Sequence, residues 1–175
     1  MSDILVGVRI FRFPEVVDER AARVVATGVV GLALLYLASG ATFLLALMAL
    51  GFAARVASGP RFSPLARFAT QVVVPRLAGP ARPTAGAPKR FAQGIGALTS
   101  SAALAAALVG ALGVAQGLVA VLVVAAGLES ALGFCIGCRL YRAGVRLGLL
   151  DRDGCTACAD LSRRSPRGVP VASGS

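Results

Sequence analysis

Two long, uninterrupted apolar stretches dominate the pattern of hydrophobic and polar positions along this chain. Residues 24–54 and 91–128 contain no charged side chain, whereas charged residues flank both stretches. Each stretch exceeds the roughly 20 apolar residues that an α-helix needs to cross the hydrocarbon core of a bilayer. Soluble core helices of this length are uncommon in a chain of 175 residues. The pattern therefore predicts membrane-spanning helices.

Each apolar stretch is too long for a single crossing and predicts a helical hairpin. At 1.5 Å per residue, residues 24–54 would form a helix of roughly 46 Å, against a hydrocarbon core of about 30 Å. Gly, Ser and Gln gather at 38–41 and at 110–117, where we expect the two chain reversals. The predicted fold class is all-α, an integral membrane four-helix protein built from two hairpins.

The placement of basic residues favours four spans over two. Residues 55–90 contain basic side chains and no acidic one, and arginines are frequent again from Arg139 onward. Short loops rich in Lys and Arg remain on the cytoplasmic side of a membrane. Four spans place both chain ends and the middle segment together on that side, whereas two spans would separate the basic segments. We therefore expect cytoplasmic termini.

This topology divides the chain into six predicted segments. In the middle segment, the stretch 62–77 contains Ser63 as a potential N-cap and Pro64 at the first helical position, which predicts a short helix that begins there and ends at Pro75. It would lie in the headgroup region or pack on the end of the bundle. The segments are a cytoplasmic N-terminal segment (1–23), a first transmembrane hairpin (24–56), a cytoplasmic loop with the interfacial helix (57–90), a second hairpin (91–134), a cytoplasmic four-cysteine segment (135–161) and a disordered tail (162–175).

Net charge and composition exclude some classes of function. The formal net charge is +10, but the basic residues flank the apolar stretches instead of forming one run interleaved with aromatic residues, so no nucleic-acid partner is predicted. The chain has no histidine, and no paired carboxylates are expected near the Cys135 and Cys138 thiols. Classical acid–base catalysis is therefore poorly supported, and the sequence does not decide whether the protein is an enzyme.

The four cysteines form two C-x-x-C pairs, Cys135 with Cys138 and Cys155 with Cys158. The predicted topology places all four in the reducing cytoplasm, where permanent disulfides are disfavoured. Their spacing, C-x2-C-x16-C-x2-C, suits a tetrahedral zinc site with four thiolate ligands. Iron–sulfur ligation would use the same residue type, but the order of the pairs does not match the common ferredoxin runs.

Thiol redox chemistry would use Cys135 and Cys138 differently. A C-x-x-C pair is the smallest unit that can attack a disulfide and then resolve the mixed intermediate. If the fourth helix continues through Cys135, the two thiols lie about 60° apart on one face. Arg139 and Arg142 then follow the thiols by four residues each and would favour thiolates, whether reactive or metal-bound. Packing of the cysteines beside glycines, with no shared site, is the third alternative.

Glu129 is the only charge in or directly after the second apolar stretch. Carboxylates within a membrane are costly and usually face a partner or a polar interior. On an ideal helix Glu129 points about 120° away from Cys135, so contact between them needs a bend, for which Gly133 is the candidate. Glu129 is predicted to be a counter-ion to an arginine of the middle loop or a proton acceptor near the thiols; the alternative is an interfacial residue that reaches the headgroups.

Four segments of the chain form recognisable motifs. They are "GPRFSPLARFA" (59–69), "PKRFAQGIG" (88–96), "LGFCIGCRLYRAGVRLGL" (132–149) and "CTACAD" (155–160). These motifs resemble an uncharacterised bacterial membrane family, the domain of unknown function 4395, and the residues carried over are Arg61, Pro64, Pro88, Arg90, Gln93, Cys135, Cys138, Cys155 and Cys158. The resemblance covers roughly residues 10–160 and implies a small multi-pass protein of the bacterial inner (plasma) membrane without an established activity. It also implies an association with thioredoxin-like and sulfurtransferase proteins.

Three functions stay open at the level of sequence. The first is thiol redox or sulfur handling by Cys135 and Cys138 with a thioredoxin-like or sulfurtransferase partner. The second is a structural zinc-binding membrane protein that uses all four cysteines. The third is a small-solute transporter, for which the polar residues of the spans are few. The lipid bilayer is a predicted partner in each case, and a homo-oligomer is compatible with all three.

Overall fold

The computed structural model describes residues 16–58, 63–76 and 83–150. Apart from one short sheet, the regular structure in these ranges is helical, which confirms the predicted all-α class. The segments predicted for 1–15 and 151–175, including the tail, lie outside the described residues. Within the described residues, three helices are long and apolar enough to cross a membrane, namely α2 (Glu19–Ser39), α5 (Gly86–Leu108) and α6 (Leu112–Leu132).

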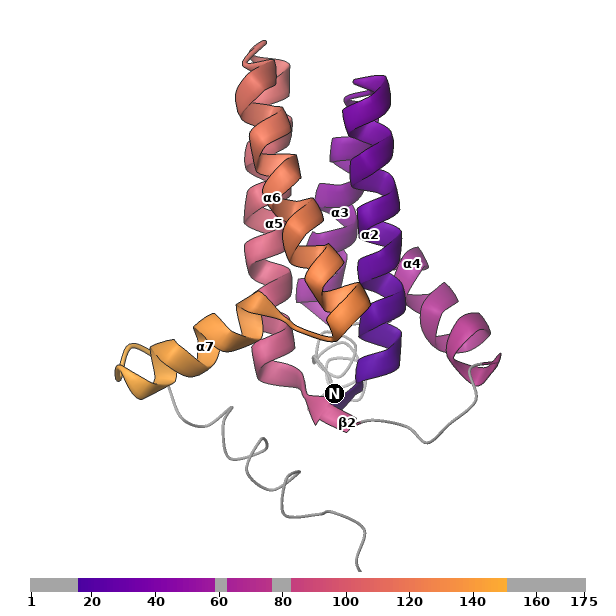
Figure 1. The fold of residues 1–175 in the computed structure, drawn as a ribbon, viewed down its shortest axis with the longest axis vertical. Helices are drawn as coiled ribbons and strands as arrows, with labels where there is room; N and C mark the ends of the chain where they lie inside the picture. Colours follow the sequence, from indigo (N-terminus) through magenta and orange to yellow (C-terminus); the bar gives the residue numbers. More distant parts are fainter. Residues whose placement is uncertain (1–15, 59–62, 77–82, 151–175) are drawn as a thin grey trace, which may run out of the picture.

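The helix α3 (Phe43–Ser58) is apolar but has only 16 residues, fewer than a typical span needs. It packs against α2 and, more extensively, against α5, and α2 also packs against α6. In Figure 1 these four helices run side by side, with both hairpin turns at the same end. A crossing by α3, and with it the fourth span, stays a prediction.

The two hairpin turns are built on glycine. Gly40, with φ of 69°, ends α2 within the 38–41 break, and its N–H donates to the carbonyl of Tyr36. Gly110, with φ of 81°, lies between α5 and α6, at the start of the predicted 110–117 break. This left-handed conformation is accessible to glycine without the steric cost that a Cβ brings. Both chain reversals are therefore specified by local sequence.

A small antiparallel sheet joins the two hairpins at the opposite end of the bundle. Its strands β1 (Val16–Asp18) and β2 (Pro83–Ala85) pair Val17 with Thr84 and directly precede α2 and α5. Asp18 also caps α2, since its carboxylate accepts a hydrogen bond of 2.9 Å from the N–H of Arg20. The first long helix consequently begins before the apolar stretch does.

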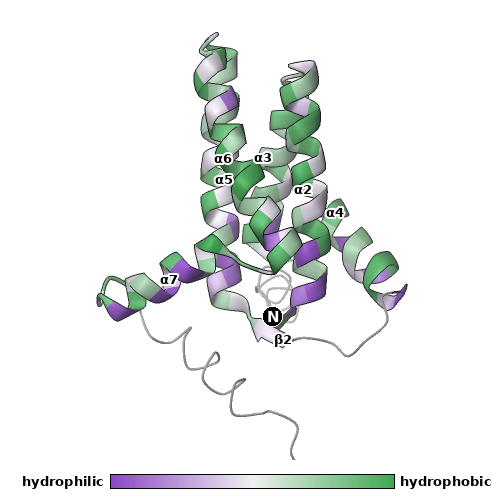
Figure 2. Ribbon diagram, viewed as in Figure 1, coloured by the Kyte–Doolittle hydropathy of each residue, from purple (hydrophilic) through white to green (hydrophobic). Residues whose placement is uncertain are grey.

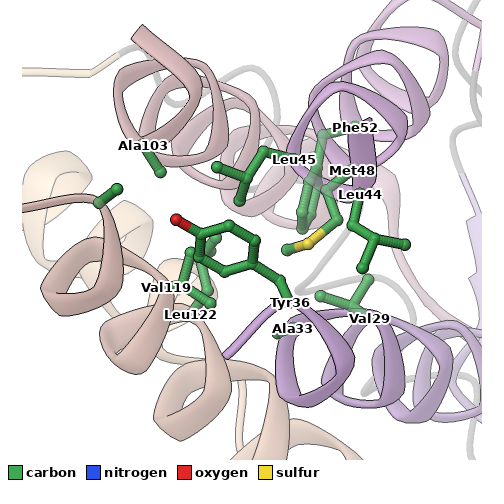
Figure 3. Packing of buried hydrophobic residues seen from close by; sticks show 11 residues of the cluster. Val29, Ala33, Tyr36, Leu44, Leu45, Met48, Phe52, Ala103, Val119 and Leu122 are labelled. Atoms are coloured by element: carbon green, nitrogen blue, oxygen red, sulfur yellow. The ribbon is translucent and has the colours of Figure 1, made fainter. Parts of the chain in front are cut away.

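The helices bury one apolar core along the axis of the bundle. Gly96 shows how closely they approach, because a Cβ at this position of α5 would lie 2.3 Å from Cε1 of Phe52 on α3. The core contains two aromatic side chains, Tyr36 and Phe52, the sulfur-containing Met48, and aliphatic and small residues (Figure 3). Its buried members are Val29, Ala33, Tyr36, Leu44, Leu45, Met48, Phe52, Ala103, Ala115, Val119 and Leu122.

The helix predicted over 62–77 begins where the sequence indicates and then changes its winding. Ser63 is the N-cap of α4 (Pro64–Phe68), which continues as a π-helical turn, η2 (Ala69–Val73), and a 3₁₀ turn, η3 (Val74–Arg76). One side of this segment packs on the bundle, since Ala66 and Ala69 form a small cluster with Val25 of α2. Phe68 on the other side is 55% exposed. Packing of this segment on the bundle is therefore observed, and its placement in the headgroup region stays a prediction.

The last described helix, α7 (Ile136–Arg146), leaves the bundle sideways, on the side opposite to α4 (Figure 1). Its buried face includes Tyr141, whose ring lies 5.7 Å from that of Phe91 on α5. Arg139, Arg142 and Arg146 are exposed. Hydrophilic residues gather at this end of the molecule (Figure 2), which is the arrangement of an amphipathic helix at a membrane surface.

Candidate thiol site

The candidate site forms where the helix α6 ends and the chain turns into α7. Gly133, with φ of 67°, ends α6, and its N–H donates to the carbonyl of Glu129 while that of Phe134 donates to the carbonyl of Leu128. The helix therefore does not continue through Cys135, which corrects the premise used to place the two thiols from sequence. Because of the bend at Gly133, Glu129 and Cys135 both line a groove between α3, α5, α6 and α7.

The two described cysteines lie at the start of α7. Cys135 is the N-cap residue and is half-buried, whereas Cys138, one turn later, is only 7% exposed. Between them Gly137 touches α5, since a Cβ there would lie 2.6 Å from the Cα of Ala92. A side chain larger than hydrogen would push the first turn of α7 off α5.

The two thiols interact with each other, and the interaction makes them unequal. A hydrogen bond from the Cys138 side chain lowers the pKa of Cys135 to about 7, with smaller lowering contributions from Lys89 and the backbone N–H of Cys138. Burial and Glu129 oppose this shift. The pKa of Cys138 is raised well above its ordinary value, first because its S–H donates the hydrogen bond to the Cys135 sulfur and then because the group is buried. The hydrogen bond between the two side chains therefore favours a thiolate on Cys135, the more exposed of the two residues.

A buried ion pair lies beside the thiols. Lys89 of α5 donates a hydrogen bond to the carboxylate of Glu129 on α6, with side-chain exposures of 8% and 15%. One of the roles predicted for Glu129 was that of counter-ion to an arginine of the middle loop, whereas its ion-pair partner is this lysine at the start of α5. Lys89 is the functional residue that sequence reasoning missed. The signal was the lone carboxylate near the end of one span, which indicates a cation at the same depth on a neighbouring helix.

The arginines that follow the thiols occupy other positions. The guanidinium of Arg139 lies 4.9 Å from the ring centre of Phe134, and Arg142 is exposed. Together with Arg146 they line a shallow surface depression on α7. The cation that favours the Cys135 thiolate is Lys89. The sequence-based role of Arg139 and Arg142 toward the thiols therefore has no geometric support within the described residues.

Further polar contacts fix the ends of the helices around the site. Buried Arg55 of α3 donates to Oε1 of Gln93 at 2.8 Å and to Oγ of Ser63 at 3.2 Å, and its guanidinium lies over the ring of Phe52. Arg23 of α2 donates to the carbonyls of Ser130 and Ala131 at the end of α6. These contacts satisfy buried polar groups and helix-terminal carbonyls, and they hold α6 in place next to the bend at Gly133.

The structure describes two of the four cysteines that the sequence predicts as zinc ligands. Within the described residues, no cluster of three or more His, Cys, Asp or Glu side chains is placed to hold a metal ion. Cys135 and Cys138 could supply two thiolates of a zinc site. Cys155 and Cys158, the other two predicted ligands, lie outside the described residues.

The fold and the thiol pair together describe a helical protein with several candidate membrane spans and a C-x-x-C pair at the charged end of its bundle. Residues 17–146 match a family model described as "Domain of unknown function (DUF4395)". Because the match covers most of the chain, the protein belongs to this family, as its motifs indicated. No curated protein and no solved structure matches the chain.

Proposed function

We propose that this protein is a four-span inner-membrane protein whose thiol pair exchanges disulfides on the cytoplasmic side. The described Lys and Arg residues gather at one end of the bundle, and the turns at the other end carry no charge (Figure 2). The positive-inside rule favours the charged end as cytoplasmic. In this topology the N-terminal segment, the 57–90 loop and the chain from Cys135 onward share the cytoplasm.

The asymmetry of the two cysteines carries the functional proposal. Thiol–disulfide exchange needs an accessible thiolate to attack and a second thiol nearby to resolve the mixed disulfide. Cys135 is half-buried with its pKa lowered to about 7, and Cys138 lies behind it with its proton retained. A thiol with a pKa near ambient pH combines a large thiolate fraction with good nucleophilicity. The pair therefore suits attack by Cys135 and resolution by Cys138.

The exchange is a balanced two-electron reaction. The Cys135 thiolate attacks one sulfur of a partner disulfide, a new S–S bond forms, and the other partner sulfur leaves as a thiolate and takes a proton. Cys138 then loses its proton and attacks Sγ of Cys135, which gives the Cys135–Cys138 disulfide and releases the second partner thiol. Two electrons pass to the partner, and the reverse reaction with a reduced partner restores the dithiol. A thioredoxin-like protein or a sulfurtransferase fits this exchange.

The zinc-binding alternative uses the same thiols but predicts that they are not free. It requires Cys155 and Cys158, and none of the described contacts favours it over the dithiol. A transporter is supported less, because the charged side chains of the described residues concentrate at one end of the bundle instead of along it.

The pH dependence of alkylation tests the proposal. In a protein with Cys155→Ser and Cys158→Ser, we expect the rate of Cys135 alkylation by iodoacetamide to rise with pH to a half-maximal value near pH 7, because only the thiolate reacts. Cys138→Ala removes the main cause of the lowered pKa and should move this midpoint upward. Cys138→Ser keeps a donor and should move it less.

The rate would be followed by mass spectrometry of the Cys135 peptide. A midpoint at the ordinary thiol pKa of about 8.5 in the protein with Cys138 intact would contradict the proposal. An unchanged midpoint in Cys138→Ala would do the same, because it would separate the thiolate from its neighbour.

A further inference from the structure

A groove of about 520 Å³ begins at the thiol site and runs along the candidate spans. This volume lies within the usual range of roughly 300–1,000 Å³ for small-molecule sites. The groove is apolar along most of its length, and its walls come from α3, α5, α6 and the first turns of α7. The residues that line it are Phe52, Ala92, Gln93, Ile95, Gly96, Ala120, Val121, Leu122, Val124, Ala125, Ala126, Glu129, Cys135, Ile136, Gly137 and Leu140.

Polar groups line the end of the groove next to α7. Cys135 and Glu129 lie there together with Gln93. The Gln93 oxygen accepts the hydrogen bond from Arg55, so its amide NH₂ group is oriented as a donor. Glu129 is held by Lys89 and can relay a proton. The groove thus offers a nucleophilic sulfur, a hydrogen-bond donor and a source of protons at one end of an apolar channel.

The groove opens toward the lipid side of the bundle. Along its rim, Val121 and Val124 of α6 are 62% and 60% exposed, and Leu140 of α7 is 52% exposed. On helices that cross a bilayer, such side chains face acyl chains. A ligand of this groove would therefore enter from the membrane, whereas a protein disulfide would reach Cys135 from the aqueous side.

We propose that this groove binds a lipid-soluble quinone, which accepts two electrons from the Cys135–Cys138 dithiol. The inference rests on the proposed exchange function and names its terminal oxidant. A quinone dissolves in the bilayer, its ring and tail suit an apolar channel, and its carbonyl oxygens accept hydrogen bonds of the kind that Gln93 can donate.

The transfer balances with the groups present. The Cys135 thiolate adds to a ring carbon, a C–S bond forms, and the displaced electron pair moves to a quinone oxygen, which takes a proton through the Glu129–Lys89 pair. Cys138 loses its proton and attacks Sγ of Cys135, so that an S–S bond forms and the C–S bond breaks. The released pair returns to the ring, and the second oxygen takes the proton from Cys138. Dithiol and quinone become disulfide and hydroquinone, and a partner dithiol then reduces the disulfide by exchange.

Anaerobic quinone reduction tests the inference. The full chain, with Cys155→Ser and Cys158→Ser, would be reduced, freed of reductant and mixed in detergent with a decyl-substituted benzoquinone. We expect saturable reduction of one quinone per chain with the loss of two thiols, and the Cys135–Cys138 disulfide in the peptide map. Stable arylation of Cys135 without hydroquinone release would overturn the proposal.

A groove-filling variant tests where the quinone binds. Ala125→Phe places a ring inside the groove, whereas Leu98→Phe adds the same ring at a site that is 74% exposed and outside the groove. We expect Ala125→Phe to lower the ratio of quinone reduction to protein-disulfide exchange about tenfold or more, and Leu98→Phe to leave it unchanged. Equal effects of the two variants would contradict the site.

The same samples separate failure of this inference from failure of the proposed function. Exchange with a protein disulfide but no quinone reduction would overturn the quinone proposal and leave the exchange function standing. The absence of both reactions would overturn both proposals.

Discussion

Replacement of Cys138 by serine is expected to trap this protein in a mixed disulfide with its redox partner. Cys135 remains able to attack a disulfide, but no thiol is left to resolve the product. Cys138 lies one turn after Cys135 at the start of α7, is buried, and shares a side-chain hydrogen bond with the attacking sulfur. The trapped species would appear on non-reducing gels of membranes and would disappear after reduction.

Replacement of Cys135 by serine is the matched control and should give the opposite result. We expect no mixed disulfide and a loss of exchange by at least about a thousandfold, because a serine hydroxyl does not replace a thiolate nucleophile. Trapping by Cys135→Ser, with none by Cys138→Ser, would reverse the assigned roles. The absence of any adduct in either variant would contradict disulfide exchange with a protein partner.

Replacement of Lys89 by methionine is expected to cause the largest loss of stability. Lys89 and Glu129 are both largely buried, and removal of the lysine leaves the carboxylate without its ion-pair partner. Breaking a buried pair in this way costs about 3–5 kcal/mol. The loss would be measured as the fall in the free energy of unfolding during SDS titration, followed by helical circular dichroism in mixed micelles.

Two further variants separate the ion pair from general effects of charge. Lys89→Met combined with Glu129→Leu removes both charges and should recover much of the lost stability. Arg90→Met removes an exposed positive charge at the neighbouring position. The Arg90 side chain donates a hydrogen bond to the carbonyl of Val56, so its loss should lower the free energy of unfolding by less than about 1 kcal/mol. If Arg90→Met costs as much as Lys89→Met, the buried pair is not the source of the effect.

Local signals were sufficient to predict much of this fold. The uncharged stretches indicated the long helices, the glycine-containing breaks indicated the turns at Gly40 and Gly110, and Ser63 with Pro64 marked the start of α4. Each of these signals acts within a few residues, through burial, a left-handed φ or a cap. They depend on no knowledge of which helix packs against which.

The pairing of helices could not be predicted in the same way. Lipid-facing and core-facing positions of these spans are both apolar, so hydrophobic periodicity does not show which face of α5 meets α3. The β1–β2 pairing joins residues far apart in sequence through three-residue strands that carry almost no signal of their own. The same limit concealed Lys89, whose role depends on the depth at which α5 passes Glu129 on α6.

The thiol site combines features set by local sequence with features set by helix packing. The cysteines, Glu129 and the bend at Gly133 were all identifiable from residue type and spacing. The different burial of Cys135 and Cys138 was not, because it depends on how α7 packs against α5 and not on residue type.

The central claim is that Cys135 and Cys138 form a reversible dithiol, and a redox titration of the purified full chain together with its metal content tests this claim most directly. After equilibration in glutathione buffers and acid quenching, we expect these two thiols to disappear together in one two-electron transition. Its potential should lie in the range of dithiol exchange proteins, roughly −120 to −270 mV, in protein free of stoichiometric zinc. One zinc ion per chain, with all four thiols protected across that range until the metal is chelated, would contradict the account.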